Sequence, residues 1–284
     1  MNKKFIQQPI SRRRFIKNLS IASLAMATPL HYALAQSNRV NSIGLQLYSL
    51  RKEMGEDFEG TLAKLAELGF KEMEFAGYFN RSANEVRSIL DANGLTSPAA
   101  HIPLTDIANN LSQVIDTAAT LGQKYIVLPF MVGADRDIDN YPRIAELLNR
   151  SGEAAKAAGL KMGYHNHDFE FDVLDGKRGY DILLNETDPD LVFFEMDLYW
   201  AATAGVDATE YFKRNPGRFP MLHVKDRAAD GKMADVGRGT IDFSEIFSLA
   251  PIAGFEHYFI EHDNPSDGIN SIAYSYRSLN QIRF

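Results

Sequence analysis

The chain has 284 residues, no cysteine and a formal charge of −7; 45% of its residues are hydrophobic and 24% are charged. These proportions are typical of a globular protein and exclude a disordered or low-complexity chain. The lack of cysteine excludes disulfide scaffolds, thiolate metal ligands and thiol catalysis.

Residues 1–35 have the three parts of an export signal. A basic run at 11–17 is followed by an apolar stretch at 19–34, and Ala33-Leu34-Ala35 forms a small-residue cleavage site before Gln36. The arginine pair followed by Phe-Ile-Lys resembles a twin-arginine signal. We therefore expect residues 1–35 to be a removed signal peptide, and the twin-arginine export machinery to deliver the folded chain to the periplasm.

Two other interpretations of this segment are weaker. A basic amphipathic helix would not explain the position of the Ala-Leu-Ala site. The apolar stretch has 16 residues, fewer than the roughly 20 needed to span a bilayer, and the chain has no cysteine for lipidation. No stable membrane anchor is therefore expected.

The mature chain, 36–284, is strongly acidic. Without the six basic residues of the signal, 24 Lys and Arg remain against 37 Asp and Glu, which gives a net charge of −13. Nucleic acids and anionic lipids need clustered Lys and Arg, so neither is an expected partner. We expect a soluble, exported domain.

Short apolar runs alternate with amphipathic helical patterns along the mature chain. Leu62, Leu65 and Leu68 are spaced as on one helix face, and Gly69 follows them as a helix-ending residue, as Gly122 does after a later helical pattern. Eight strands alternating with about eight helices in ~250 residues predict a (β/α)8 TIM barrel in a single α/β domain. A doubly wound sheet is the rival, but no glycine-rich phosphate loop follows the first run. The predicted strand regions are 42–48, 72–78, 97–102, 125–130, 161–167, 191–198, 221–225 and 258–262.

Four of these strand regions end in polar residues. Side chains alternate along a strand, so residues two apart share a face. Active sites of TIM barrels lie at the carboxyl ends of the strands, and buried His and carboxylate groups are costly there unless they bind something. The pairs that share a face are His165 with His167, Glu195 with Asp197, His223 with Lys225, and Glu261 with Asp263.

The simplest occupant of this end of the barrel is one divalent metal ion. The predicted ligands are His165, Asp197, His223 and Glu261. Two nitrogens and two carboxylates suit Mn²⁺, our first choice, or Co²⁺, Fe²⁺, Zn²⁺ or Mg²⁺, rather than Ca²⁺. A single His at a strand end is more often a hydrogen-bonded structural residue, but four such coincidences are improbable. The groups expected to orient the ligands are His167, Glu195 and Asp263, although Glu195 has a plainer interpretation as an ion-pair partner of Lys225 or Arg238.

Several segments resemble one known family. The segments 43–51, 72–77 and 236–243, together with His223-Val224-Lys225-Asp226, are similar to the xylose isomerase-like barrel family, often labelled sugar phosphate isomerase/epimerase. The resemblance covers essentially the whole mature chain. It implies that Asp197, His223 and Glu261 hold a divalent metal ion. The family's remaining ligand is usually the Glu of a Glu-Asn-His run, where this chain has His165-Asn166-His167.

The implied chemistry is proton abstraction next to a carbonyl, through a metal-stabilised enediolate. The candidate acid/base residues are Glu261, His165, His167 and Lys225. The family's epimerases use two Glu ligands on opposite faces of the sugar, so His165 disfavours a symmetric two-base epimerisation and suits a lyase with one base and one acid. We expect a sugar isomerase or epimerase, with a 3-keto-glycoside lyase or hydratase as the alternative.

The expected location guides the choice of substrate. Sugar phosphates are cytoplasmic metabolites, so an exported member is expected to act on an unphosphorylated keto-sugar or keto-glycoside. The candidate substrate-binding residues are His101, Glu74, Trp200, Arg238 and Glu195. A non-catalytic sugar-binding barrel is a third interpretation, and the charge of −13 disfavours the endonuclease branch of the family. The sequence leaves open whether the chain forms a homo-oligomer.

Overall fold

The computed structural model describes residues 38–284, and Arg39–Phe284 forms one compact unit. The predicted signal peptide, residues 1–35, lies outside the described residues. Within the described part of the chain, no helix combines the length and the apolar character required to cross a bilayer.

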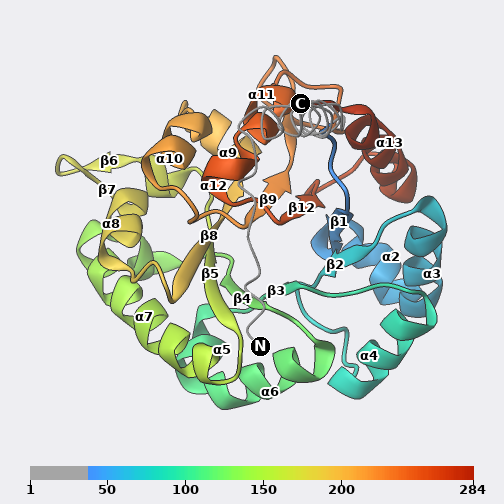
Figure 1. Cartoon of the computed structure of the whole chain (residues 1–284), viewed down its shortest axis with the longest axis horizontal. Helices are drawn as coiled ribbons and strands as arrows, with labels where there is room; N and C mark the ends of the chain where they lie inside the picture. The colour runs from blue at the N-terminus through green and yellow to red at the C-terminus, as the bar shows by residue number, and fades with distance from the viewer. Residues whose placement is uncertain (1–37) are drawn as a thin grey trace, which may run out of the picture. The chain divides into compact units, whose positions relative to one another are not determined.

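Eight parallel strands form a barrel at the centre of this unit (Figure 1). Neighbours along the sheet run in the order β2-β1-β12-β9-β8-β5-β4-β3. Bridges from Glu72 to Thr96 and from Phe75 to Ala100 close the ring between β2 and β3. This arrangement confirms the predicted (β/α)8 TIM barrel. The barrel strands are β1 (Ile43–Gln46), β2 (Glu72–Glu74), β3 (Ala99–His101), β4 (Tyr125–Leu128), β5 (Lys161–His165), β8 (Val192–Asp197), β9 (Met221–Val224) and β12 (His257–Ile260).

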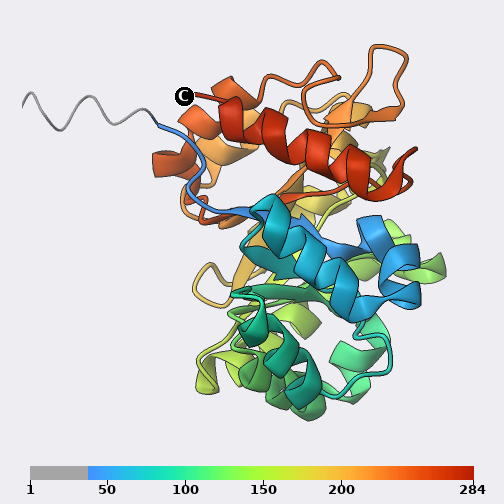
Figure 2. The same ribbon diagram turned by 90° about the vertical axis from the view of Figure 1, so that its right-hand side faces the viewer.

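Helices follow every barrel strand and surround the sheet (Figures 1 and 2). Gly69 (φ +106°) ends one of them and Gly122 (φ +71°) another in the left-handed conformation that glycine adopts without strain, as the sequence predicts. The helices are α2 (Arg51–Glu56), α3 (Phe58–Leu68), α4 (Ala83–Ala92), α5 (Leu104–Asn109), α6 (Leu111–Leu121), α7 (Tyr141–Ala157), α8 (Gly179–Glu186), α9 (Leu198–Thr203), α10 (Ala208–Arg214), α11 (Phe243–Ser248), α12 (Ala250–Ala253) and α13 (Gly268–Gln281).

Short elements decorate the loops between the main strands and helices. They were not predicted from the sequence, because two-residue strands and single helical turns carry no periodic pattern. Two antiparallel hairpins pair β6 (Val173–Leu174) with β7 (Lys177–Arg178) and β10 (Asp226–Arg227) with β11 (Met233–Ala234). The 3₁₀ turns are η1 (Leu47–Leu50), η2 (Gly133–Arg136), η3 (Ile138–Asn140) and η4 (Phe169–Phe171).

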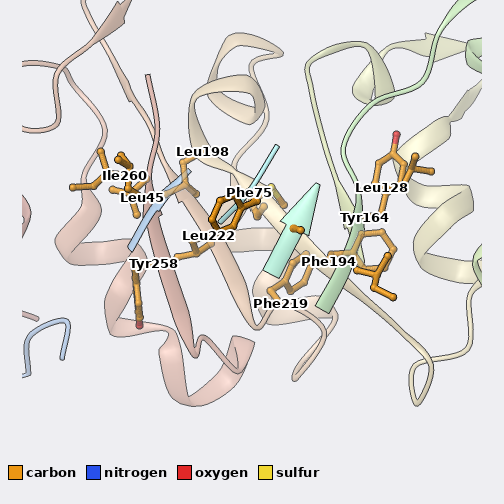
Figure 3. Close-up of a cluster of buried hydrophobic side chains, with 14 of the residues drawn as sticks. Leu45, Phe75, Leu128, Tyr164, Phe194, Leu198, Phe219, Leu222, Tyr258 and Ile260 are labelled. Carbon is orange, nitrogen blue, oxygen red and sulfur yellow. The ribbon is translucent and has the colours of Figure 1, made fainter. Parts of the chain in front are cut away.

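Two apolar clusters stabilise the barrel. The larger one packs strand side chains such as Leu45, Phe194 and Leu222 against the surrounding helices (Figure 3). The smaller one consists of Ala99, Tyr125, Val127, Met221 and Phe259. Alternation along the strands puts Met221 on the same face as His223. The smaller cluster is therefore an apolar floor inside the barrel, and the polar residues of the predicted site lie above it.

Candidate active site

Four side chains at the carboxyl ends of the strands form what we call the upper cluster: His165, Asp197, His223 and Glu261. One ligand atom of each lies within 4.8 Å of those of the other three. His223 Nδ1 lies 2.9 Å from Glu261 Oε2, and His165 Nε2 lies 3.4 Å from Asp197 Oδ2. All four side chains are buried. The structure thus brings together the four residues that the sequence predicts as metal ligands.

Hydrogen bonds behind the upper cluster orient its ligand atoms. His165 Nδ1 lies 3.1 Å from the carbonyl oxygen of Pro129, so the ring is held with Nε2 facing Asp197 Oδ2. The backbone N–H of Trp200 donates to Asp197 Oδ1 at 2.8 Å, which leaves Oδ2 facing the cluster. Asn166 Oδ1 accepts from the backbone N–H of Asp197 at 3.0 Å. The donor atoms therefore fit a divalent cation.

Lys225 is buried among the carboxylates beside this cluster. Its Nζ lies 2.7 Å from Glu261 Oε2, 3.2 Å from Asp197 Oδ2 and 2.8 Å from Asp263 Oδ1. Burial alone would lower the pKa of Lys225, but these carboxylates raise it above its usual range. Burial would also raise the pKa values of Asp197 and Glu261, yet the ammonium holds both well below their usual range. Lys225 is therefore charged, and it lies where it can donate a proton.

A second group, which we call the lower cluster, surrounds the other nitrogen of His223. It consists of Glu74, His101, Glu195 and His223, whose ligand atoms also lie within 4.8 Å of one another. His223 Nε2 lies 2.7 Å from Glu74 Oε2 and 3.2 Å from Glu195 Oε2. His101 Nε2 lies 2.8 Å from Glu195 Oε2. The ion-pair partners of Glu195 are therefore His101 and His223, rather than the Lys225 or Arg238 considered from the sequence.

Burial dominates the electrostatics of the lower cluster. Burial, together with the charge of Glu195, raises the pKa of Glu74 to about 8. Burial lowers the pKa of His101 to about 4, despite its hydrogen bond to Glu195. The neighbouring imidazoles hold the pKa of Glu195 below its usual range, against the effect of burial. The protein alone therefore does not favour two ionised carboxylates at this depth.

A cavity of about 660 Å³ opens onto the upper cluster. Its wall includes Tyr48, which is 43% exposed, and Phe130, which is 38% exposed, so aromatic faces are available to a ligand. Among the predicted substrate-binding residues, His101 lines the cavity, whereas Glu74 and Glu195 are fully buried. The polar lining residues are His101, Asp106, His165, His167, Lys225, Glu261 and Asp263. An aromatic wall beside a cluster of acid/base groups suits a sugar-sized, polar ligand.

Comparison with known proteins identifies the family. The model of the xylose isomerase-like TIM barrel matches residues 62–280. The chain belongs to this family. The match covers the barrel strands from β2 to β12, and it includes every residue of the upper and lower clusters.

Curated relatives and solved structures agree with this assignment. An inosose dehydratase from Clostridium perfringens is 23% identical over 80% of this chain and 89% of its own. A sugar phosphate isomerase/epimerase from Parabacteroides distasonis superimposes with a TM-score of 0.73 at 27% identity, covering 86% of this chain and 94% of that one. The IOLI protein, solved with a zinc atom, has a TM-score of 0.65 at 15% identity, with 84% and 97% coverage, and shows the shared fold. Relatives in this family are therefore enzymes that include dehydratases and isomerases or epimerases.

His167 and Trp200 lie beside the upper cluster of this xylose isomerase-like barrel. The His167 ring is 5.3 Å from the Trp200 ring and 4.6 Å from the Phe130 ring, measured between centroids. Burial and the neighbouring His165 lower the pKa of His167 far below its usual value. His167 is therefore a neutral imidazole on the cavity wall.

Arg238 has a different setting from the other predicted site residues. Its guanidinium lies 3.3 Å from Asp235 and 4.1 Å from the centroid of the Tyr274 ring, and it is not among the residues that line the cavity. The glycines on either side of Arg238 bind Asp226 through their backbone. The carboxylate of Asp226 accepts hydrogen bonds from the N–H groups of Gly237 and Gly239, both at 2.9 Å. Asp226 therefore anchors the loop that contains the family-like motif at 236–243.

Glu170, a buried carboxyl group beside the site, was not predicted from the sequence as a site residue. It accepts hydrogen bonds from the hydroxyl of Tyr164 at 2.6 Å and from the backbone N–H of His167 at 2.8 Å. Burial raises its pKa to about 7. The sequence offers one signal for its burial, because Glu170 lies between Phe169 and Phe171, just after the polar end of the strand. Glu170 holds the chain segment that carries His167.

Proposed function

We propose that this chain is a divalent-metal-dependent lyase for an unphosphorylated keto-sugar or keto-glycoside. The observation that carries the proposal is one charged acid, Lys225, and one neutral base, His167, on the wall of a single cavity beside the upper cluster. The relative named inosose dehydratase supports an elimination. The family's usual Glu is replaced by His165, which removes one carboxylate base and favours elimination over two-base epimerisation.

The upper cluster would hold the metal ion, which when bound polarises the substrate carbonyl and stabilises negative charge on its oxygen. His167 accepts the proton from the carbon next to the carbonyl. The electron pair left behind forms a carbon–carbon double bond while the bond to the β-oxygen substituent breaks. Lys225 donates a proton to that departing oxygen, so that an alcohol or water leaves and an unsaturated keto-sugar remains.

Isomerisation is the second candidate function. It would begin with the same proton abstraction and end with the proton on the neighbouring carbon. The Parabacteroides structure named as a sugar phosphate isomerase/epimerase supports it. The two functions differ in whether the β-substituent leaves.

A reaction in deuterium oxide separates these candidates. The protein is loaded with Mn²⁺ and incubated with a 3-keto-glucoside, the reaction is stopped with chelator, and the filtrate is examined by proton NMR. We expect free aglycone and an unsaturated keto-sugar, neither of which forms with chelator-treated protein. Deuterium next to the ketone with an intact glycosidic bond would favour isomerisation, and no change in any sample would contradict both enzymatic functions.

Two variants test the acid and the base separately. Lys225→Arg keeps the buried charge but donates a proton poorly, so we expect deuterium exchange to continue and aglycone release to fall. His167→Gln is expected to stop both exchange and release. Lys213→Arg, on the exposed surface, is the matched control and should behave as the wild type.

We also propose that residues 1–35 direct twin-arginine export to the periplasm, where unphosphorylated substrates would be met. The arginine pair and the small-residue site in the sequence support this proposal. Cell fractionation of the wild type and of the double variant Arg12→Lys/Arg13→Lys tests it. The wild type should be periplasmic and shortened, and the variant should stay in the cytoplasm at full length.

A further inference from the structure

The lower cluster holds two buried carboxyl groups that have no Lys or Arg among their ion-pair partners in the described part of the chain. Glu74 and Glu195 are both fully buried. Among the described residues, their ion pairs run to the imidazoles of His101 and His223 and to no Lys or Arg. An imidazole in contact with a carboxylate neutralises it only when it carries two protons. Two buried carboxylates without a permanent cation are costly.

Two oxygens of this cluster also lack a hydrogen-bond partner. Within the described part of the chain, Oε1 of Glu74 and Oε1 of Glu195 are buried and accept no hydrogen bond. Glu74 Oε1 lies 3.6 Å from His101 Nε2, beyond hydrogen-bond distance. Buried polar atoms are nearly always satisfied in folded proteins. These unpaired oxygens point to a ligand with positive charge.

The bonding of His223 leaves its lower nitrogen available. Nδ1 faces Glu261 and Asp197 in the upper cluster, and Nε2 faces Glu74 and Glu195. If Nδ1 coordinates a metal ion there, Nε2 either carries a proton or coordinates a second ion. A proton on Nε2 would satisfy one oxygen by hydrogen bonding and would leave Oε1 of both glutamates unpaired.

We propose that Glu74, His101, Glu195 and Nε2 of His223 bind a second divalent cation, with His223 as an imidazolate bridge between two ions. On binding, the proton of Nε2 is released to solvent, and the cation balances the two glutamate charges. Two nitrogens and two carboxylate oxygens suit Zn²⁺, Mn²⁺, Co²⁺ or Fe²⁺. His101 also lines the cavity, so one proposed ligand of the second ion lies at the cavity wall.

The test counts metal ions in the full chain. Metal-free protein is loaded with Zn²⁺, desalted and examined by native mass spectrometry and elemental analysis. We expect two ions per chain in the wild type and one in Glu74→Gln. Glu72→Gln is the matched control, because Glu72 lies on the same strand but pairs with His257, and it should keep two ions. His101→Gln should also bind one ion, and this variant replaces Glu74→Gln in the test if Glu74→Gln fails to fold.

Cobalt and manganese give readouts that are independent of turnover. Co²⁺ titration followed by absorption should show two binding steps in the wild type, and one step in Glu74→Gln and in His101→Gln. Mn²⁺-loaded wild type should show magnetic coupling between two ions, which both variants lose. A single ion in the saturated wild type, or two ions in both variants, would overturn the proposal. Two ions with no elimination or exchange would contradict the proposed function alone.

Discussion

The upper and lower clusters neutralise their buried carboxylates in different ways. In the upper cluster, the ammonium of Lys225 contacts Asp197 and Glu261 directly. In the lower cluster, Glu74 and Glu195 contact imidazoles, whose charge depends on protonation and on metal binding. A permanent ammonium keeps carboxylates ionised before any metal ion arrives. The same barrel therefore holds one pair of carboxyl groups beside a lysine and another pair beside two histidines.

Removing the ammonium of Lys225 should have the largest effect on the stability of the metal-free protein. Lys225→Met leaves buried carboxylates without their cation, and we expect it to lower the free energy of unfolding of the metal-free protein by about 3–5 kcal/mol. Added Mn²⁺ should restore part of that loss. Urea unfolding followed by circular dichroism, with and without chelator, measures both effects. The exposed Lys213→Met is the control, and equal losses in the two variants would contradict the contrast.

Glu170 sharpens the comparison, because it is a buried carboxyl group that has hydrogen-bond donors but, among residues 38–284, no ion-pair partner. Burial raises its pKa from 4.5 to about 7. Its contribution to stability is therefore complete below about pH 4.5 and is lost as the pH rises through about 7. Relative to Glu170→Gln, the wild type should lose up to about 3 kcal/mol over this range. Urea unfolding at several pH values measures this difference. Parallel profiles would refute the prediction, and the exposed Glu153→Gln should give such parallel profiles.

Asn166 tests how far the upper cluster depends on the groups that orient it. Asn166→Ala removes the acceptor for the backbone N–H of Asp197 and the donor to its carbonyl oxygen. We expect a loss of about 1–3 kcal/mol in stability and of about 10–100-fold in Zn²⁺ affinity. Competition with a chromophoric chelator measures the affinity. The exposed Asn185→Ala should change neither quantity, and unchanged affinity in Asn166→Ala would show that Asp197 needs no such support.

The smallest effect is expected at Arg238, an exposed ion pair outside both clusters. Its side chain is 58% exposed, and such pairs contribute less than about 1 kcal/mol. Arg238→Ala should therefore leave stability and kcat/KM nearly unchanged with the 3-keto-glucoside. A large rise in KM would instead show that the loop carrying Arg238 reaches the substrate.

The barrel could be predicted from sequence because its signals are local and repeated. Each of the eight predicted strand regions overlaps one strand of the sheet, and Gly69 and Gly122 end helices as expected. The small hairpins escaped prediction, since β6 and β10 each have two residues and no periodicity. The predicted signal peptide stays a prediction.

The proximity of the four predicted ligands could also be predicted from the sequence, because each lies near the carboxyl end of a predicted strand of the barrel. Barrel closure brings equivalent strand ends together, so His165 and Glu261 converge although 95 positions separate them. The two-sided role of His223 could not be predicted, because it depends on ring orientation and on the neighbours of each nitrogen. The partners of Glu74 depend in the same way on strand order around the ring, which links β2 to β3 by bridges alone.

The anchor at Asp226 has a consequence for engineering. Its carboxylate binds the backbone of 237–241, and a Cβ at Gly239 would collide with it, so the loop is clamped at its base. The hairpin tip, 228–232, lies between β10 and β11, and the hydroxyl of Tyr199 donates a hydrogen bond to the carbonyl oxygen of Gly231 at 3.1 Å. A peptide tag or reporter inserted between the exposed Ala229 and Asp230, away from the hydrogen bond at Gly231, should therefore be carried without shifting Lys225.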